Sequence, residues 1–220
     1  MSTVETTDAI SGASGVQPRV AFQGELGAFS ELAIRQQWPA GATPLPCRTF
    51  PDAIACVVHG TADFAVIPVE NAIVGTVDVA IRALHDAAGT VVERSELRVP
   101  IHLCLLAPFG ASLGDVRVVH SHPVALGQCR VFFARHGWLH PIAHDDTAGA
   151  ARMVAERGDR SVGAVASTMA AERYGLAILA AHIEDIPVNW TRFVVISASV
   201  TPGQHGEPST MGRRSPKIRV

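Results

Sequence analysis

Short apolar runs alternate along most of the chain with stretches in which apolar residues recur at helical spacing. A continuous apolar run predicts a strand that is covered on both faces, and a spacing of three and four residues predicts a helix. The expected strands cover 19–24, 63–71, 97–108, 115–123, 161–167 and 192–198. The expected helices cover 28–38, 51–58, 76–87, 147–156 and 168–174, and a further helix starts at Pro123.

Repeated strand–helix units are typical of an α/β fold with largely parallel sheets. Roughly eight strands in about 180 residues suit two small α/β lobes with a cleft between them. We place lobe 1 at 19–97 together with 188–199, and lobe 2 at 98–187. The segments 1–18 and 200–220 are rich in small and polar residues, so we expect both to be disordered.

The composition argues against several classes of protein. The chain has 220 residues, of which 48% are hydrophobic, and a net charge of -2. It carries no basic stripe, so we expect no nucleic-acid partner. No apolar run reaches the roughly 20 residues that span a bilayer. The polar N-terminus shows no signal pattern, so we expect a cytoplasmic protein without a membrane partner.

The residues that commonly bind metals form neither a CxxC nor an HExxH motif. The four cysteines are scattered without a CxxC pair, which fits free buried thiols in a reducing compartment. The ten histidines include no HExxH pattern. The sequence therefore predicts no metal site.

Polar residues gather where expected strands end, which is where ligands bind in open α/β sheets. Gly24 and Gly27 follow the first strand, and two such glycines let backbone amides approach an anion. A tight strand–helix turn explains this pair without a ligand. Glu70 and Asn71 end the strand at 63–71, either facing the cleft or as a helix cap with a solvated carboxylate.

Two later junctions repeat the arrangement. Ser121 stands before the helix that starts at Pro123, where its hydroxyl either caps that helix or meets a carboxylate. Asp146 or Thr147 stands in the same position before the next helix. Capping is a sufficient explanation for each one. Several such junctions together indicate a shared anionic ligand.

The last expected strand begins with polar residues, in the segment VNWTRFVVISAS at 188–199. Thr191 and Arg192 stand directly before the apolar part, and side chains alternate along a strand. The two side chains should therefore face opposite ways. If Thr191 faces the cleft, Arg192 has a structural role, for example in an ion pair with a carboxylate, rather than a contact with a substrate carboxylate.

Read together, these motifs resemble the catalytic domain of prephenate dehydratase over about 19–199. They are Gly24-x-x-Gly27-x-Phe29-Ser30, Ile67-Pro68-Val69-Glu70-Asn71, Ser121-His122-Pro123 with Gln128-Cys129, and Asn189-Trp190-Thr191-Arg192-Phe193. The resemblance implies two α/β subdomains, like those of type II periplasmic binding proteins, with the active site in the cleft. It also implies conversion of prephenate to phenylpyruvate in phenylalanine biosynthesis, without a metal or an organic cofactor.

The resemblance implies a role for particular residues. Thr191 corresponds to the essential threonine of the family. The other residues expected at the substrate are Glu70, Asn71, Ser121, Gln128, Thr147, Gly24, Gly27, Phe29, Arg192 and Phe193. Prephenate is a dianion that loses its ring hydroxyl and carbon dioxide, so the site needs a donor at the leaving hydroxyl and neutral donors for two carboxylates. We expect Thr191 as that donor or as a proton relay, with a desolvated, protonated Glu70 as the alternative acid.

Two residues depart from the pattern of the family, and three alternative functions remain open. The family usually has a hydroxyl residue where this chain has Ala72, and often a glutamate where it has Val74; either change could alter affinity or substrate choice. The chain ends soon after the last expected strand, so we expect no regulatory ACT domain and no feedback inhibition through one. The alternatives are an arogenate dehydratase, a non-aromatising prephenate decarboxylase and a two-lobed protein that only binds a small carboxylate. The intact Glu-Asn and Thr-Arg-Phe elements favour dehydration over decarboxylation.

The charged fraction bears on assembly. Only 17% of the residues are charged, which suggests that a second subunit covers part of the surface. An Ala- and Val-rich composition explains the same number equally well. With the family resemblance, we expect a homodimer.

Overall fold

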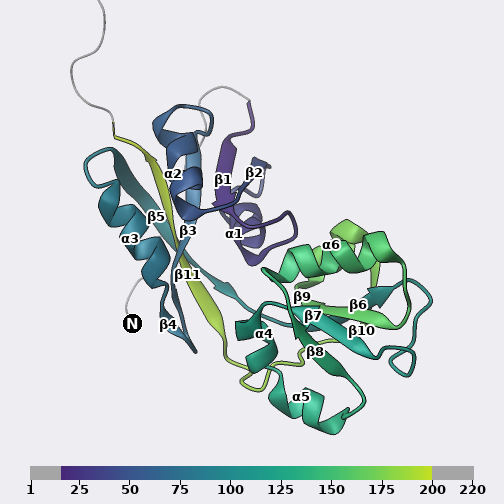
Figure 1. Ribbon diagram of the computed structural model, residues 1–220. Coiled ribbons are helices and arrows are strands. Elements are labelled where there is room, and N and C mark those ends of the chain that lie inside the picture. The colour runs from purple at the N-terminus through teal and green to yellow at the C-terminus, as the bar shows by residue number, and fades with distance from the viewer. Residues whose placement is uncertain (1–15, 200–220) are drawn as a thin grey trace, which may run out of the picture.

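The computed structural model of the protein describes residues 16–199, which form two α/β lobes (Figure 1). Each lobe is built on one mixed sheet. The first sheet has the order β2 (Thr43–Cys47), β1 (Arg19–Gln23), β3 (Phe64–Asn71), β11 (Trp190–Ala198) and β5 (Val91–Pro100), and β4 (Gly75–Thr76) pairs with β3. The second sheet has the order β10 (Leu176–Ala180), β6 (Cys104–Pro108), β9 (Val162–Ala166), β7 (Val118–Ser121) and β8 (His140–Ala143).

The helices cover these sheets. The first lobe contains α1 (Phe29–Gln37), α2 (Phe50–Val58) and α3 (Asp78–Asp86). The second contains α4 (Pro123–Gly127), α5 (Arg130–Arg135), α6 (Thr147–Arg157) and α7 (Thr168–Tyr174). The chain crosses between the lobes twice, from β5 to β6 and from β10 to β11. This arrangement confirms the expected fold class.

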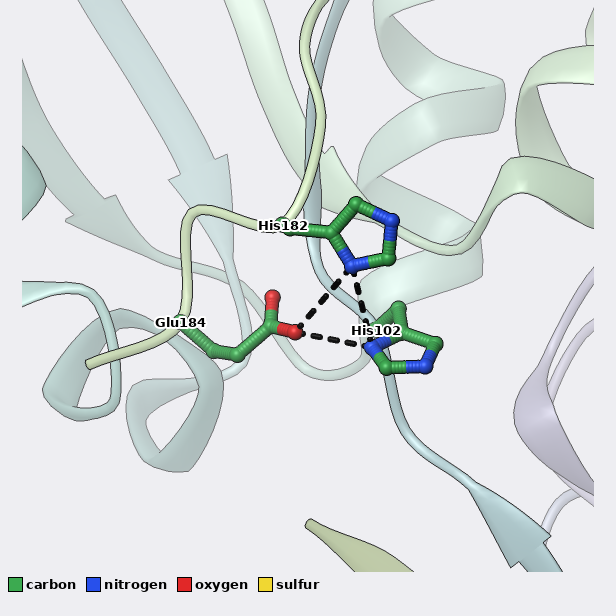
Figure 2. Close-up of side chains that lie close together, drawn as sticks. All are labelled: His102, His182 and Glu184. Atoms are coloured by element: carbon green, nitrogen blue, oxygen red, sulfur yellow. Dashed lines mark hydrogen bonds and ion pairs between the residues drawn. The ribbon is translucent and has the colours of Figure 1, made fainter. Parts of the chain in front are cut away.

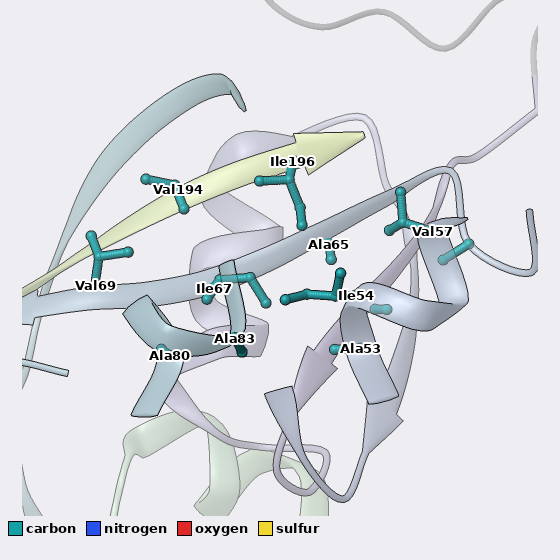
Figure 3. Close-up of a cluster of buried hydrophobic side chains, with 12 residues drawn as sticks. Ala53, Ile54, Val57, Ala65, Ile67, Val69, Ala80, Ala83, Val194 and Ile196 are labelled. Atoms are coloured by element: carbon teal, nitrogen blue, oxygen red, sulfur yellow. The ribbon is translucent and has the colours of Figure 1, made fainter. Parts of the chain in front are cut away.

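The core of the first lobe explains why its strands read as continuous apolar runs. Ile67 of β3 and Val194 and Ile196 of β11 pack with α2 and α3 on one face of the sheet (Figure 3). Val66 and Val195, one residue along each strand, pack with α1 on the other face. Both faces are therefore covered, and successive side chains all enter apolar cores.

The sheets are mixed, so the expectation of largely parallel sheets was wrong. β11 pairs antiparallel with both β3 and β5, and β6 pairs antiparallel with both β9 and β10. The reason is the double crossing: β11 enters the first sheet from the second lobe and runs back between two strands of that sheet. The single strand expected over 97–108 is likewise two strands, β5 and β6, separated by the crossing at 101–103.

Four strands were not predicted: the two-residue strand β4, and three strands that lie at sheet edges. β2 contains two prolines, β8 is exposed at all four residues, and β10 is only partly covered. An edge strand buries little apolar surface, so its sequence lacks the signal of a core strand. The short helix α5 has no buried residue and was missed for the same reason.

The observed helix caps decide which residue caps α6, Asp146 or Thr147, and whether Ser121 caps α4. Asp146, rather than Thr147, caps α6 by accepting a hydrogen bond from the Gly149 amide at 2.6 Å. Ser121 does not cap α4, because the Nδ1 atom of His122 accepts from the Val124 amide at 3.2 Å.

The predicted terminal disorder falls mainly on residues 1–15 and 200–220, which lie outside the described residues. Pro18 was placed in the disordered segment, but it is buried and its carbonyl accepts from the Thr43 amide at 2.8 Å. Within 16–199, no helix combines the length and the apolar character needed to cross a bilayer.

Candidate active site in the interlobe cleft

A cavity of about 380 Å³ is lined by residues of both lobes and of the first crossing between them. The first lobe contributes the end of β1, the start of α1, β3 and β11, and the second contributes the starts of α4 and α6. The lining residues are Gln23, Gly24, Ala28, Phe29, Ser30, Pro68, Asn71, Val74, Val77, Ile101, Leu103, His122, Val124, Ala125, Gln128, Asp145, Asp146, Thr147, Thr191 and Phe193. Seven of the predicted site residues are among them: Gly24, Phe29, Asn71, Gln128, Thr147, Thr191 and Phe193.

The buried amide of Asn71 makes the Thr191 hydroxyl an acceptor on the side that faces Asn71. The Oδ1 atom of Asn71 accepts from the backbone amides of Ile73 and Val74, at 3.0 and 3.2 Å. Its Nδ2 group must therefore point the other way, where it donates to Thr191 Oγ1 at 3.0 Å. Because one lone pair of Oγ1 is used in this bond, the hydroxyl hydrogen is free to be donated into the cleft.

Asn189 connects this pair to the second lobe. Its side chain is buried, and its Oδ1 atom accepts from Asn71 Nδ2 at 3.0 Å. Its own Nδ2 group donates to Gln128 Oε1 at 3.3 Å. The Gln128 oxygen is thereby occupied, which leaves the NH₂ group of this cleft residue as a donor. A chain of side-chain amides thus links Thr191 with Gln128 across the lobes.

Two helices, α1 with nine residues and α6 with eleven, begin at the cleft. Phe29 and Ser30 form the first turn of α1, and Thr147 is the first residue of α6. The first amides of a helix have no acceptor within it, and the helix dipole adds a partial positive charge there. Among the described residues, the cavity lining contains no Arg or Lys. Neutral donors and helix ends are therefore what the cleft offers to a carboxylate.

Glu70 and Arg192 lie outside the cavity lining, so two predicted site residues are placed elsewhere. In the register of the two strands, Thr191 pairs with Asn71 and Arg192 with Glu70. Thr191 and Asn71 share the cleft side, and the next pair lies on the other face of the sheet. There Arg192 bonds Glu70 and Glu96, each at 3.0 Å, and the bond to Glu70 raises the pKa of the guanidinium.

Ser121 and Gly27 are also outside the lining. The Ser121 hydroxyl is fully buried and donates to the Val165 carbonyl at 2.6 Å, which ties β7 to its neighbour β9. The Gly27 amide donates to Glu31 at 2.5 Å, and its carbonyl accepts from the Ser167 hydroxyl at 2.8 Å. The polar groups of both residues therefore have partners within the structure around the cleft.

Gly27 is required where the two lobes touch. Its φ is +92°, and a Cβ atom there would stand 3.0 Å from the Ala170 Cα of the second lobe. Tyr174 donates to the adjacent Leu26 carbonyl at 2.5 Å, and Arg173 forms an ion pair with the buried Glu31. The 24–31 segment is thus held closely against α7.

We expect Gly27→Ala to lower the free energy of unfolding by about 1–3 kcal/mol, because the methyl group adds overlap to a left-handed backbone. Urea denaturation measures this loss. Gly60→Ala is the matched control, since Gly60 has a φ of +71° but nothing within 4 Å of its Cβ position. Equal losses in both variants would contradict the proposed packing at Ala170.

Sequence reasoning missed several cleft residues. Asn189 stood inside a quoted motif, and its place directly before Trp190 and Thr191 was the available signal. Asn189 lies outside the lining and bonds the lining residues Asn71 and Gln128, whereas Asp145 and His122 line the cavity. Neither forms a pattern with the other in the sequence, because different connections bring them to the cleft.

Two α/β lobes with a cavity and a polar network between them form the kind of architecture in which proteins commonly bind a small molecule. The family model for prephenate dehydratase matches residues 20–201. The chain belongs to the prephenate dehydratase family.

Two relatives and one solved structure show the extent of the similarity. Over 195 residues, the chain is 43% identical to a bifunctional N-acyl-homoserine lactone acylase/prephenate dehydratase of Komagataeibacter europaeus, covering 87% of this chain and 68% of that protein. It is 36% identical over 208 residues to arogenate dehydratase/prephenate dehydratase 2 of Arabidopsis thaliana, covering 92% of this chain and 52% of that protein. The chain therefore spans about half the length of the plant relative.

The solved structure is the prephenate dehydratase of Arthrobacter aurescens in complex with L-Phe. It aligns with a TM-score of 0.76 at 30% identity, covering 83% of this chain and 61% of that one. The likeness extends over both lobes, so the family assignment and the fold agree.

Proposed function

We propose that this chain converts prephenate to phenylpyruvate, with loss of water and carbon dioxide. The observation that carries the proposal is the hydrogen bond from Asn71 to Thr191 Oγ1, which leaves the hydrogen of this cleft-lining hydroxyl free to be donated to a substrate. The reaction breaks the bond between the ring and its carboxylate, whose electron pair enters the ring. It also breaks the bond to the ring hydroxyl, which leaves as water after taking up a proton.

The cleft residues fit these requirements. Thr191 donates a hydrogen bond to the leaving hydroxyl and stabilises the charge that develops on it. The NH₂ group of Gln128 and the first amides of α1 and α6 hold the two carboxylates. The Glu70 carboxyl is paired with Arg192 at 3.0 Å on the other face of the sheet, which argues against Glu70 as the acid.

A second candidate is the dehydration of arogenate, in which an ammonium group replaces the side-chain carbonyl of prephenate. The observation that favours it is the presence of Asp145 and Asp146 in the cavity lining. Carboxylates near a dianion are unfavourable, whereas an ammonium group pairs with them. The Arabidopsis relative carries both activities in its name.

Steady-state kinetics with both substrates tests the proposal. We expect the purified chain to form phenylpyruvate from prephenate, read by its absorbance in alkali. Asp145→Asn should raise kcat/KM for prephenate by about 2–10-fold, because it removes a negative charge beside a dianion. Asp86→Asn is the control, since this side chain is 83% exposed on α3.

Each outcome decides between the candidates. A preference for arogenate that Asp145→Asn removes would favour the second candidate. Consumption of prephenate without an aromatic product would mean decarboxylation. Binding without consumption of either substrate would overturn a catalytic function.

The proposal includes a location in the cytoplasm and a homodimer, and only the homodimer is supported by the charged fraction of 17%. The molar mass of the purified chain in solution tests the dimer.

A further inference from the structure

A cluster of two histidines and one glutamate lies at the two crossings between the lobes (Figure 2). His102 belongs to the crossing from β5 to β6, and His182 and Glu184 belong to the crossing from β10 to β11. Its ligand atoms are the Nδ1 atoms of both histidines and Oε1 of the glutamate. The nitrogens are 3.2 Å apart, and the oxygen lies 2.8 Å from His102 Nδ1 and 3.6 Å from His182 Nδ1.

The glutamate is held in position before any ligand binds. Its side chain is only 2% exposed, and its Oε2 atom accepts from the Leu103 amide at 2.9 Å. This bond directs Oε1 at the two histidines. Such a fixed carboxylate is what a metal site requires of its surroundings.

Hydrogen bonds alone do not satisfy the three contacts. An imidazole nitrogen carries either a hydrogen or a lone pair. His102 Nδ1 therefore cannot donate to Glu184 and also accept from His182. A cation between the three atoms would be bound by all of them at once.

The spacing of the atoms matches a metal site. Bonds of about 2.0–2.1 Å around tetrahedral zinc place neighbouring ligand atoms about 3.3–3.4 Å apart. The three separations, 2.8, 3.2 and 3.6 Å, lie around this value. Only small shifts of the exposed histidine rings are needed to bring all three to bonding distance.

The backbone at His182 is a second, independent observation. Its φ is +52°, and it is the one residue other than glycine with a positive φ within 16–199. This conformation is uncommon for side chains other than Asn, Asp and His, and it concentrates at functional positions. Here it turns the imidazole towards His102 and Glu184.

We propose that His102, His182 and Glu184 bind one divalent transition-metal ion of the zinc type. Two imidazole nitrogens and one carboxylate oxygen suit such ions better than Mg²⁺ or Ca²⁺, which prefer oxygen ligands. The side chains of His102 and His182 are 40% and 67% exposed, so solvent reaches the fourth coordination position. This open position holds a water molecule.

The site would join the two chain crossings on which any lobe movement depends. Ile101 and Leu103, on either side of His102, line the cavity. A metal bound at His102 would fix this segment against the return crossing and so stiffen one wall of the cleft. The inference does not depend on the reaction, because metal binding is measured directly.

The test is titration of chelator-treated protein with ZnCl₂ in a calorimeter, together with the melting temperature. We expect one Zn²⁺ per chain and a rise in Tm on loading. His182→Asn should weaken binding at least 10-fold and abolish the rise, while asparagine keeps the left-handed backbone. Glu184→Gln, which keeps the shape and the bond from Leu103, should also weaken binding at least 10-fold.

His85→Asn is the matched control, since His85 is an exposed histidine of α3 (87%) outside the cluster, and it should bind as the unchanged chain does. The proposal is overturned if the unchanged chain binds no Zn²⁺. It is also overturned if His182→Asn and Glu184→Gln, both folded by circular dichroism, bind as tightly as His85→Asn.

Discussion

Replacing Thr191 with alanine is expected to lower kcat for prephenate by about 10²–10⁴-fold, the range typical of a lost catalytic donor. The Thr191 hydroxyl accepts a hydrogen bond from Asn71, so its own hydrogen can be donated to a group in the cleft. KM should change less, because Gln128 and the helix ends still hold the carboxylates. Steady-state rates of phenylpyruvate formation measure both constants.

Two further variants make this result specific. Thr191→Ser keeps the hydroxyl and should retain most of the activity. Thr90→Ala removes an exposed hydroxyl that donates to the Ala87 carbonyl at 2.7 Å. Thr90 does not line the cavity, so this variant should not change kcat. If Thr191→Ala is folded and stays within 10-fold of the unchanged chain, Thr191 is not the donor.

Replacing Asn71 with aspartate is expected to lower kcat by about 10²-fold or more, although the side chain hardly changes shape. One carboxylate oxygen still accepts from the Ile73 and Val74 amides. The other takes the place of the NH₂ group and faces Thr191 Oγ1. The threonine hydrogen then turns towards the carboxylate, and the cleft loses its donor.

The same substitution also affects folding. The new oxygen faces two acceptors that cannot donate, Asn189 Oδ1 and the Trp190 carbonyl, which Asn71 Nδ2 now contacts at 3.0 and 3.1 Å. We expect a loss of about 1–3 kcal/mol in the free energy of unfolding, since the buried Asn189 oxygen is left without a donor, whereas the Trp190 carbonyl keeps its bond from the Ala72 amide at 2.9 Å. Urea denaturation of the variant measures it.

Asn189→Asp is the matched control for catalysis. It keeps the oxygen that accepts from Asn71 and replaces the donor to Gln128 Oε1 with a second carboxylate oxygen, so it adds the same charge as Asn71→Asp. The Thr191 bond is preserved, so the loss of kcat should be clearly smaller than in Asn71→Asp. Equal losses in the two variants would show that the direction of the Thr191 hydroxyl does not matter.

The positions of several cleft residues followed from the ends of predicted elements. Gly24, Asn71 and Thr147 stand where a strand ends or a helix begins, and such junctions meet at one edge of an α/β sheet. These residues could be identified without knowing which distant strands pair with each other. Ser121 stands at the same kind of junction, yet its hydroxyl bonds the Val165 carbonyl at 2.6 Å within the sheet. Junction position alone does not say which way a short side chain turns.

The sequence by itself determined the α/β class, the strands with two covered faces and the opposite orientation of Thr191 and Arg192. These properties depend on local periodicity, which reports burial and alternation directly. Only the tertiary structure decided that β11 enters antiparallel, so that its register pairs Asn71 with Thr191 and Glu70 with Arg192. It alone brought His102 to His182 and Glu184, some 80 residues away in the chain. Contacts of this kind depend on how distant segments cross, and no local pattern records a crossing.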